Sequence, residues 1–465
     1  MKKKEKIFYL LIILCFIVLS LVVGGKHEAW ADEAHAWLIA RDTSFYTLFF
    51  KYLHTDGHPA LWHLILKFFQ CIGFKYENIY LISTLFSSIG VSIFLFKSKF
   101  KWYIKLLLPF SYFVFYQYTV VARGYCLILL LLSCIASFWE DRVDKCYLFS
   151  FFLVLLLSSE AYTFFLAGMI YLIYIYDYIK IRMGDKSNKK DGNKLLRCLI
   201  GLGIFFILTV LYVYPISSNT FHITTHNYFI SDSFITTYNE GWIVKLIISI
   251  VIICWIYIVY LKEKSLNKYM QLWYFLLPII LFYFLMYYNA WHLGILFLSF
   301  IFVLWIQGMD NSKMLNILMV VCLLVQGYWS LCSIKYEYSN KYSSSLDVAN
   351  FIKRYDYENL NILGASFNES GVNPYFDKNI YDNWNEDIGF FYWNTNNKYY
   401  DDYTYFKIYD IVVVSDFYVN QFNNLGYSVD DRYNSYYFEG YSFIEDYKYE
   451  SLGTTVYVLK EIDNK

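Results

Sequence analysis

The chain has 465 residues, is 58% hydrophobic and 23% aromatic, and has only 17% charged residues with a formal net charge of zero. Apolar runs of roughly 16 to 22 residues recur between residues 7 and 332, close to the length that crosses about 30 Å of hydrocarbon. This pattern excludes an ordinary soluble protein and predicts an all-α polytopic membrane protein. The nine cysteines lie in or beside the apolar runs without metal-ligand spacing, so we expect no disulfide framework.

The first predicted element is a span near 7–23, which follows a lysine-rich start. This start, the apolar run and the two alanines of Ala29-Trp30-Ala31 also mimic a secretory signal with its cleavage site. The apolar core is long for a signal and the candidate site lies well beyond it, so we expect an uncleaved span. Further spans are expected near 77–96, 104–120, 124–139, 146–159, 161–178, 198–216, 242–260, 271–288, 293–308 and 314–332, which gives about 11 in all.

The distribution of lysine and arginine predicts the orientation. With the N-terminus inside, basic clusters such as 97–105 and 180–197 also face inside, as the positive-inside rule requires. The segment 60–74 decides the number of crossings, because a crossing there would put the cluster at 97–105 outside. An amphipathic helix lying in the outer interface keeps that cluster inside, and we prefer this interpretation. The prediction is a multi-pass cell-membrane protein with a cytoplasmic N-terminus and an external C-terminus.

The first outer loop, 24–59, brings carboxylates, imidazoles and aromatic rings together at the edge of the bilayer. On a helix the neighbours Asp32 and Glu33 diverge by about 100°, so the two carboxylates cannot easily share a proton and should have different roles. Asp32 would then lie beside His35. Further candidate binding residues of this loop are His54, Asp56 and His58.

All eight histidines fall on the outer side under this topology: His27, His35, His54, His58, His63, His222, His226 and His292. Together with the acids of the first loop they indicate a polar cavity that opens outward. Arg123 lies at the outer mouth between two spans, where an arginine is costly unless it is paired or reaches the interface, so a lipid phosphate is a natural partner. Glu160 and His292 lie in short outer hairpins, where each is a candidate to bind a metal or sugar or to cap a helix.

From about residue 334 the chain becomes polar and rich in acidic residues and tyrosine. Strand-like runs at 362–363, 411–414 and 455–459 alternate with a helix-like segment at 346–354. We therefore expect a membrane domain, 1–333, and a small exported α/β domain, 334–465. We expect no nucleic-acid partner.

Three motifs occur in a recognisable order: Asp32-Glu33-Ala-His-Ala-Trp37, Gly57-His58-Pro59-Ala-Leu61 and Ala122-Arg123-Gly-Tyr125-Cys-Leu127. This order resembles the polyprenyl-phosphate-sugar-dependent glycosyltransferases of the GT-C class, especially the protein O-mannosyltransferase and aminoarabinose transferase superfamily (glycosyltransferase family 39-like). The resemblance covers residues 1–180 well and the other spans loosely. The chain differs from many relatives in having Val121 where they have an acid, and Glu160-Ala-Tyr162 where they have His-Tyr.

The resemblance implies a GT-C-like membrane domain with interfacial helices and a catalytic aspartate in the first outer loop, and a lipid phosphate bound nearby. A sugar on a polyprenyl phosphate already has a good leaving group, so one base suffices for a single inverting displacement by an acceptor hydroxyl. We assign Asp32 as this base, with Glu33 as the second catalytic residue. Arg123 and Tyr125 would bind the donor phosphate as its charge builds.

The other candidates would bind the acceptor or the sugar: His35, His54, Asp56, His58, Glu160 and His292. Glu33, with His58 or Glu160, would orient the acceptor or hold a divalent metal. A metal stays an open alternative, because spacing alone does not define three or four convergent ligands. The expected partners are a polyprenyl-phosphate-linked sugar, membrane lipids and an extracytoplasmic acceptor, which is a protein or a glycan.

Two other classes of function remain. A transporter or flippase of lipid-linked or cell-envelope precursors should place ionisable groups in the middle of its spans, often on broken helices. In this chain the spans are nearly free of such groups, which favours chemistry at the interface. A receptor or scaffold for the exported domain would make the carboxylates of the first loop dispensable.

Overall fold

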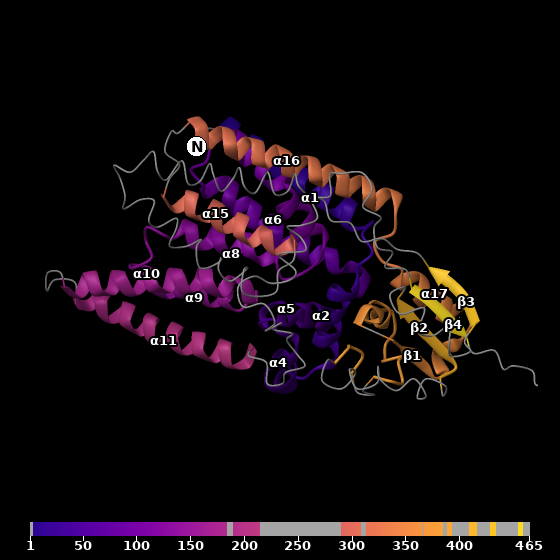
Figure 1. Cartoon of the computed structure of the whole chain (residues 1–465). Coiled ribbons are helices and arrows are strands. Elements are labelled where there is room, and N and C mark those ends of the chain that lie inside the picture. The colour runs from indigo at the N-terminus through magenta and orange to yellow at the C-terminus, as the bar shows by residue number, and fades with distance from the viewer. Residues whose placement is uncertain are drawn as a thin grey trace, which may run out of the picture.

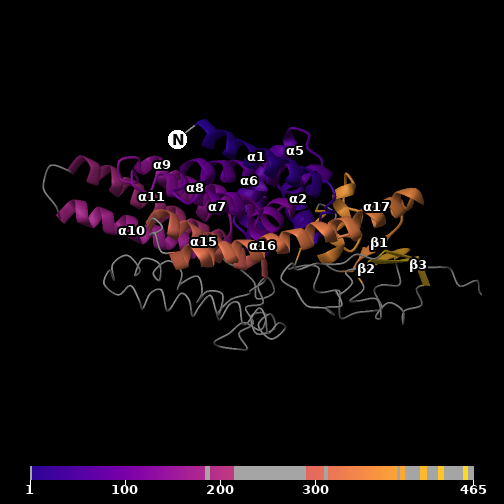
Figure 2. The ribbon, with the colours of Figure 1, turned by 90° about the horizontal axis from the view of Figure 1, so that it is seen from above.

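The computed structural model describes residues 3–183, 189–213, 290–307, 313–365, 367–384, 388–392, 409–415, 428–433 and 454–458. Helices make up most of these residues, and a small sheet lies beside one end of the helical bundle (Figures 1 and 2). Two expected spans, 242–260 and 271–288, lie outside the described residues, and so do His222 and His226.

Five described segments are long and apolar enough to cross a membrane: Lys3–Gly24, Tyr76–Lys97, Ala161–Met183, Gly192–Val213 and Leu315–Ser339. They correspond to α1 (Lys3–Gly24), η2 with α6 (Tyr76–Asn78, Ile79–Lys97), η5 with α10 (Ala161–Thr163, Phe164–Met183), α11 (Lys189–Val213) and α16 (Lys313–Ser339). Shorter apolar helices are α8 (Cys126–Ser137), α9 (Cys146–Leu157) and α15 (Leu293–Gln307). The chain is a helical membrane protein, as its composition predicts.

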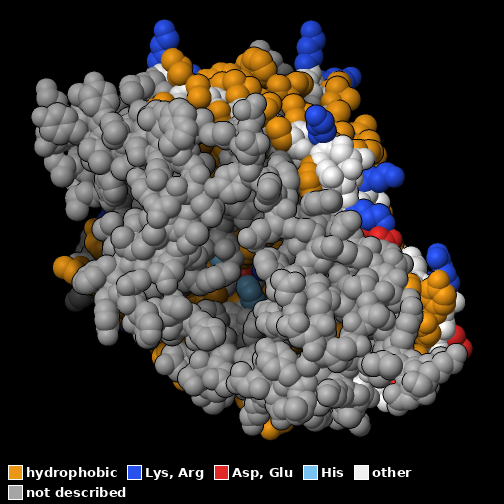
Figure 3. Space-filling model, turned by 45° about the vertical axis from the view of Figure 1, so that its right-hand side comes forward, with side chains coloured by type: hydrophobic (Ala, Val, Ile, Leu, Met, Phe, Trp, Pro, Cys, Tyr) orange, Lys and Arg blue, Asp and Glu red, His pale blue; other side chains and the backbone are white. Residues whose placement is uncertain are grey.

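The surface of the bundle suits contact with lipid. Helix α16 exposes apolar side chains along its length, among them Ile317, Val321, Leu324 and Leu331. Figure 3 shows hydrophobic side chains gathered over the top of the molecule, where α16 lies. Water would not stabilise such a continuous apolar face, whereas lipid tails do.

The N-terminus and the basic cluster at 97–105 lie at the same end of the bundle. The rings of Tyr9 and Phe96 are 5.8 Å apart, and Lys105 Nζ lies 4.8 Å from the Tyr9 ring. Helix α5 (Leu61–Cys71) has 11 residues and is too short to cross a bilayer. The interfacial interpretation of 60–74 stays a prediction, with which a helix of this length is consistent.

The expected span at 104–120 is not one helix. It divides into α7 (Trp102–Leu107), the 3₁₀ turn η3 (Leu108–Phe110) and the π-helix η4 (Tyr112–Val120). Pro109 lies at the start of η3, and Ser111 has an extended backbone with φ −68° and ψ 151°. Proline cannot donate a backbone hydrogen bond, so the helix breaks here and η4 begins in a new direction. Every residue of η4 is buried.

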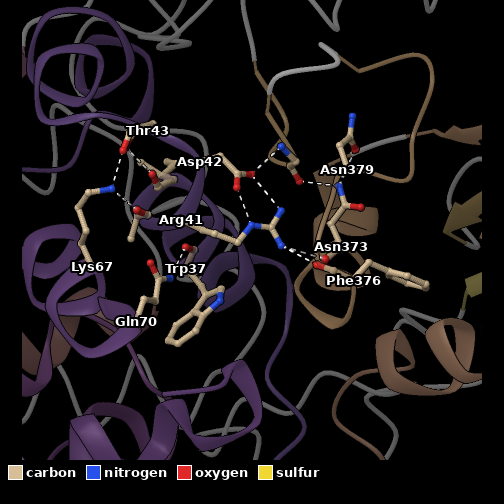
Figure 4. Close-up of polar contacts among 12 residues, drawn as sticks. Trp37, Arg41, Asp42, Thr43, Lys67, Gln70, Asn373, Phe376 and Asn379 are labelled. Atoms are coloured by element: carbon tan, nitrogen blue, oxygen red, sulfur yellow. Dashed lines mark hydrogen bonds and ion pairs between the residues drawn. The ribbon is translucent and has the colours of Figure 1, made fainter. Parts of the chain in front are cut away.

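The first outer loop is largely helical. It contains α2 (Ala31–Asp42), α3 (Phe45–Thr47), the π-helix η1 (Leu48–Tyr52) and α4 (Leu53–Asp56). Helix α2 packs against α5, where Lys67 Nζ donates to the carbonyls of Ala40 (2.8 Å) and Thr43 (2.5 Å). The lysine thereby caps the C-terminal end of α2 with a positive charge. Figure 4 shows this contact on one side of α2 and residues of the C-terminal region on the other.

The C-terminal region joins α2 through Arg41 and Asp42. The guanidinium of Arg41 donates to both carboxylate oxygens of Asp42 (2.5 and 3.0 Å) and to the carbonyl of Phe376 (2.8 Å). Asp42 also accepts a hydrogen bond from the backbone N–H of Gly389 (2.7 Å). Arg41 and Asp42 lie at the centre of Figure 4, and Phe376 lies on the side of the C-terminal region. Carbonyls and an amide that the C-terminal region would otherwise leave unsatisfied are thus paired with α2.

The described part of the C-terminal region combines helix and sheet. Helix α17 (Ser345–Arg354) covers a sheet in the order β1-β2-β4-β3, with β1 (Ile362–Gly364), β2 (Ile411–Ser415), β4 (Thr454–Val458) and β3 (Ser428–Tyr433). Strands β1 and β2 are parallel, and the other neighbours are antiparallel. The expected helix and three of these strands occur at the positions that the sequence indicates; β3 was not anticipated. The region has its own apolar core, which includes Val348, Ile352, Ile362, Trp384 and Ile411.

Candidate functional site

The adjacent acids of α2 point to different partners. Glu33 is completely buried, whereas the Asp32 side chain is 20% exposed and faces Arg123. Neighbours on a helix diverge by about 100°, and each carboxylate reaches a different element. The separation expected for two neighbouring acids on a helix is therefore present in α2. His35 lies three residues further along the same helix, and its Nε2 is 3.4 Å from Asp56 Oδ1.

Glu33 holds the beginning of α2 in place. Its Oε1 accepts from the N–H of Ala122 (2.6 Å), and its Oε2 accepts from the N–H of Trp30 (3.1 Å) and from His27 Nε2 (3.1 Å). The bond to Trp30 completes a helix cap, and the bond to Ala122 joins α2 to the turn that carries Arg123. Both carboxylate oxygens are thus occupied by the protein.

His27 extends this network to α16. Its Nδ1 lies 2.9 Å from Glu337 Oε1, which also accepts a hydrogen bond from the hydroxyl of Tyr116 (2.6 Å). Burial works to lower the pKa of His27, but the carboxylates of Glu337 and Glu33 outweigh it and raise this pKa to about 10. The ring is therefore an imidazolium at pH 7 and bridges two buried acids.

Asp32 and Arg123 form an ion pair at the less buried side of α2. Arg123 Nη1 lies 2.8 Å from Asp32 Oδ2. The guanidinium also lies over the rings of Tyr125 (5.0 Å) and Trp291 (5.5 Å). Burial works to lower the pKa of Arg123, but Asp32 outweighs it and holds this pKa above its ordinary value. Arg123 is therefore a permanent cation beside the candidate base.

A second ion pair joins His58 and Glu160. Gly57 ends α4 with a left-handed backbone (φ 72°), which glycine adopts without strain, and the chain then turns through His58. The N–H of Leu61 donates to the carbonyl of Ser158 (3.0 Å), which holds this turn against the hairpin of Glu160. His58 Nδ1 lies 3.0 Å from Glu160 Oε2. Burial works against the charge on His58, but Glu160 outweighs it and raises the pKa to about 9.

No family model matches the chain, and no curated protein matches it.

His292 lies beside the two ion pairs as a neutral ring. It is buried in η8 (Ala290–His292) and stacks on Tyr162, with ring centroids 3.8 Å apart and an interplanar angle of 28°. Burial, with the charges of Arg123 and His58 nearby, holds the pKa of His292 well below its usual value. The two stacked rings are both buried, with His292 3% and Tyr162 8% exposed.

Asp56 lies between two imidazoles. Its Oδ1 is 3.4 Å from His35 Nε2, and its Oδ2 is 3.4 Å from His63 Nε2. Burial works to raise the pKa of Asp56, but the hydrogen bond from His35 outweighs it and holds the pKa well below its usual range. The rings of Phe367 and Phe390 lie 5.1 and 5.8 Å from His35, so the C-terminal region covers this cluster.

The structure thus brings most of the predicted residues to one end of the bundle. Asp32, Arg123, Tyr125, His58, Glu160 and His292 lie together, and His35 and Asp56 lie next to them under the aromatic cover. His54 lies in α4 and is partly exposed. Within the described ranges, no group of three or more His, Cys, Asp or Glu side chains has the geometry to hold a metal ion, so a metal stays an untested alternative.

Three contributors were not among the residues predicted for the site. His27, Tyr116 and Glu337 form the buried network behind Glu33, and Tyr116 and Glu337 lie far from the first loop in the sequence. One signal was present in the sequence: Glu337 lies near the end of an apolar helix, where an acid needs a partner. Its partner could not be named without knowing that α1, η4 and α16 are neighbours.

Proposed function

We propose that the chain is a membrane-embedded glycosyltransferase. It moves a sugar from a polyprenyl-phosphate donor to an acceptor hydroxyl at the outer face of the cell membrane. Asp32 is the base in a single inverting displacement. The observation that carries the proposal is the pair of Asp32 and Arg123 at 2.8 Å. Asp32, a carboxylate that can accept a proton, and Arg123, a cation that can bind a phosphate, are thus in direct contact.

The proposed reaction balances with these two groups. The acceptor oxygen attacks the anomeric carbon of the sugar, and its proton passes to the carboxylate of Asp32. The bond between the anomeric carbon and the phosphate oxygen breaks, and polyprenyl phosphate leaves with the electron pair. In this proposal Arg123 stabilises the negative charge that grows on the leaving phosphate. Its guanidinium packs on the rings of Tyr125 and Trp291.

Glu33 has a positioning role in this proposal. Its oxygens accept hydrogen bonds from Ala122 and Trp30 and contact His27, so the carboxylate is not free to receive a substrate proton. The bond to Ala122 holds the start of α2 against the turn of Arg123. Glu33 therefore sets the distance between the base and the cation, which is a requirement of catalysis by orientation.

In this proposal the sugar lies beside the buried stack of Tyr162 and His292. Sugar rings have apolar faces that pack on aromatic rings. The covered cluster of Asp56, His35 and His63 supports this side of the site rather than lining it. In the proposed arrangement residues 1–333 form the membrane domain, and 334–465 form an α/β domain outside the cell membrane.

The test uses the purified full chain in detergent or nanodiscs with a panel of labelled polyprenyl-phosphate sugars. We expect Asp32→Asn to reduce turnover by about 10²- to 10⁴-fold, the usual contribution of a general base. Thermal unfolding is measured in parallel, because the loss of the Arg123 partner should also cost about 1–3 kcal/mol. Asp141→Asn, at an exposed acid paired with Lys145, is the matched control and should retain activity. Turnover by Asp32→Asn at the unmodified rate would remove Asp32 as the base. Absence of transfer from every donor of the panel would contradict the proposed class of enzyme.

A further inference from the structure

Arg123 has a second cation beside it. The side chain of His58 is 33% exposed, whereas that of its partner Glu160 is only 5% exposed, so the carboxylate lies behind the ring. The charge of Arg123 works to lower the pKa of His58, which places the two cations within electrostatic reach of each other. Among the described residues, His58 has a hydrogen-bond partner for Nδ1 but none for Nε2. One N–H of the imidazolium therefore remains to donate.

Gly124 makes this arrangement possible. A Cβ atom at position 124 would lie 2.5 Å from Glu160 Oε1 and 3.2 Å from Trp62 Cβ. The carboxylate of Glu160 thus occupies the space that a larger residue would fill, directly beside the backbone of Arg123. Because Glu160 is held there, His58 is held on the same side of the turn as the guanidinium.

A buried hydroxyl adds a further donor to the same place. The Tyr125 hydroxyl is buried and has no hydrogen-bond partner within the described part of the chain. Its ring carries the guanidinium of Arg123 at 5.0 Å. A buried hydroxyl without a partner costs free energy, and a ligand oxygen would relieve that cost.

We propose that His58 is the second cation of an anion site with Arg123, and that the site binds the phosphate of an isoprenoid phosphate. This rests on the proposed function and moves His58 and Glu160 from the acceptor side of the site to the donor side. A phosphate has several acceptor oxygens, so it can bind a guanidinium and an imidazolium at once. Glu160 acts through His58 and is a positioning residue.

The same geometry requires Asp32 to give up its partner. In the structure Arg123 is paired with Asp32, whereas His58 contacts Glu160 through Nδ1. A bound phosphate takes the guanidinium and leaves the carboxylate of Asp32 free to accept a proton. Donor binding would therefore prepare the base.

Phosphate binding should follow the charge on His58. The groups that face this ring are Glu160 and Asp56, which favour its charge, Arg123, which opposes it, and the neutral rings of His63 and His292. The pKa of His58 is about 9, so the imidazolium is present below that value and is lost as the pH rises through it. Affinity for a phosphate should be steady between about pH 7 and 8 and fall above about pH 9.

The experiment measures equilibrium binding of labelled farnesyl phosphate to the intact protein in nanodiscs. His58→Gln and Arg123→Gln should each weaken binding by at least about ten-fold, and Glu160→Gln should weaken it less. Lys75→Gln removes an exposed cation and should leave the affinity unchanged. The loss of affinity above pH 9 should appear in the unmodified protein and be absent from His58→Gln. Thermal unfolding of each variant checks that it is folded, and the pH profile of the unmodified protein needs no variant.

Two further probes separate the sources of the anion. Farnesol should bind at least about ten-fold more weakly than farnesyl phosphate, and inorganic phosphate should compete only weakly because it lacks the chain. Equal binding of farnesol, strong competition by inorganic phosphate, or unchanged affinity in His58→Gln with no loss above pH 9 would each overturn the proposal. Binding needs no turnover, so a missing transfer reaction with intact, His58-dependent binding would reject the proposed enzyme and not this site.

Discussion

At the scale of single residues, His27 is the clearest case of a side chain whose charge is set by burial and neighbours. It lies between Glu33 and Glu337 at 3.1 and 2.9 Å, and all three side chains are almost completely buried. Isolated burial of either acid would be costly, whereas a shared imidazolium satisfies both. The network joins α2 to α16 across most of the length of the sequence.

This network predicts how stability depends on pH. The pKa of His27 rises from its ordinary 6.5 to about 10 in the folded chain, so the folded state binds more protons than the unfolded state between these values. Stability is therefore greatest below about pH 6.5 and falls as the pH rises towards 10. Thermal unfolding in detergent across this range measures the slope.

The variant His27→Gln tests the assignment. It should lower the free energy of unfolding by about 3–5 kcal/mol at pH 7, because two buried acids lose their cation. Its stability should also depend less on pH between 6.5 and 10 than that of the unmodified protein. An equal slope in both proteins would show that another group titrates.

The candidate residues could be chosen from the sequence, but their pairing could not. Asp32 was selected from its motif in the first loop, and Arg123 because an arginine at a membrane boundary needs a partner. The structure pairs the two with each other. Glu33 resembles Asp32 in the sequence, yet it is buried and fully bonded. The difference depends on Ala122 and His27, whose approach is decided by tertiary packing.

At the scale of elements, α2 is held from two sides. Lys67 of α5 caps its C-terminal end, and Arg41 and Asp42 join it to the C-terminal region (Figure 4). The helix that carries Asp32 is therefore positioned partly by residues near the end of the chain. The sequence pattern predicts α17, but it gives no information on such a contact.

Removal of the Asp42 charge should loosen this junction. Asp42→Asn leaves Arg41 without its carboxylate and weakens the acceptor for the N–H of Gly389, so we expect a loss of about 1–3 kcal/mol in unfolding free energy. Limited proteolysis should also cut residues near 389 faster. Asp347→Asn, at a more exposed ion pair with Lys341, is the control and should change stability by less than about 1 kcal/mol. Equal effects of the two variants would mean that the junction adds nothing specific.

Helix continuity was the feature of the membrane elements that the sequence predicted least well. The segment 104–120 is apolar throughout and was expected to be one span, but Pro109 and the extended Ser111 divide it. The π-helix η4 that follows depends on contacts such as the bonds from Ser83 to Thr119 (2.6 Å) and from Ser87 to Tyr118 (3.1 Å). Hydrophobicity does not encode these partners.

At the scale of the whole molecule, the charge pattern and the helix arrangement agree. The basic clusters at the N-terminus and at 97–105 lie at one end of the bundle, and the candidate site lies at the other (Figure 1). The sequence could predict a helical membrane protein and its polar end, because both follow from composition and charge. The total number of spans stays a prediction, since 242–260 and 271–288 lie outside the described residues.

A topology reporter tests the predicted orientation. A reporter fused after Lys465 should read as exported, because about 11 crossings from a cytoplasmic N-terminus end outside. A reporter inserted at Ser98, in the basic connection after α6, should read as cytoplasmic. A cytoplasmic signal at Lys465 with the same result at Ser98 would mean that the crossings after α6 are miscounted by one.

The contact between Asp32 and Arg123 also affects which lipids can bind to Arg123. An arginine at the lipid boundary would ordinarily attract any headgroup that drifts past, and the bilayer supplies these in great excess. Here the carboxylate of Asp32 already pairs with the guanidinium, so a lipid headgroup must displace Asp32 in order to bind Arg123. A ligand with strong negative charge and a second point of attachment would compete best for Arg123, whereas a phospholipid held by its headgroup alone would compete poorly.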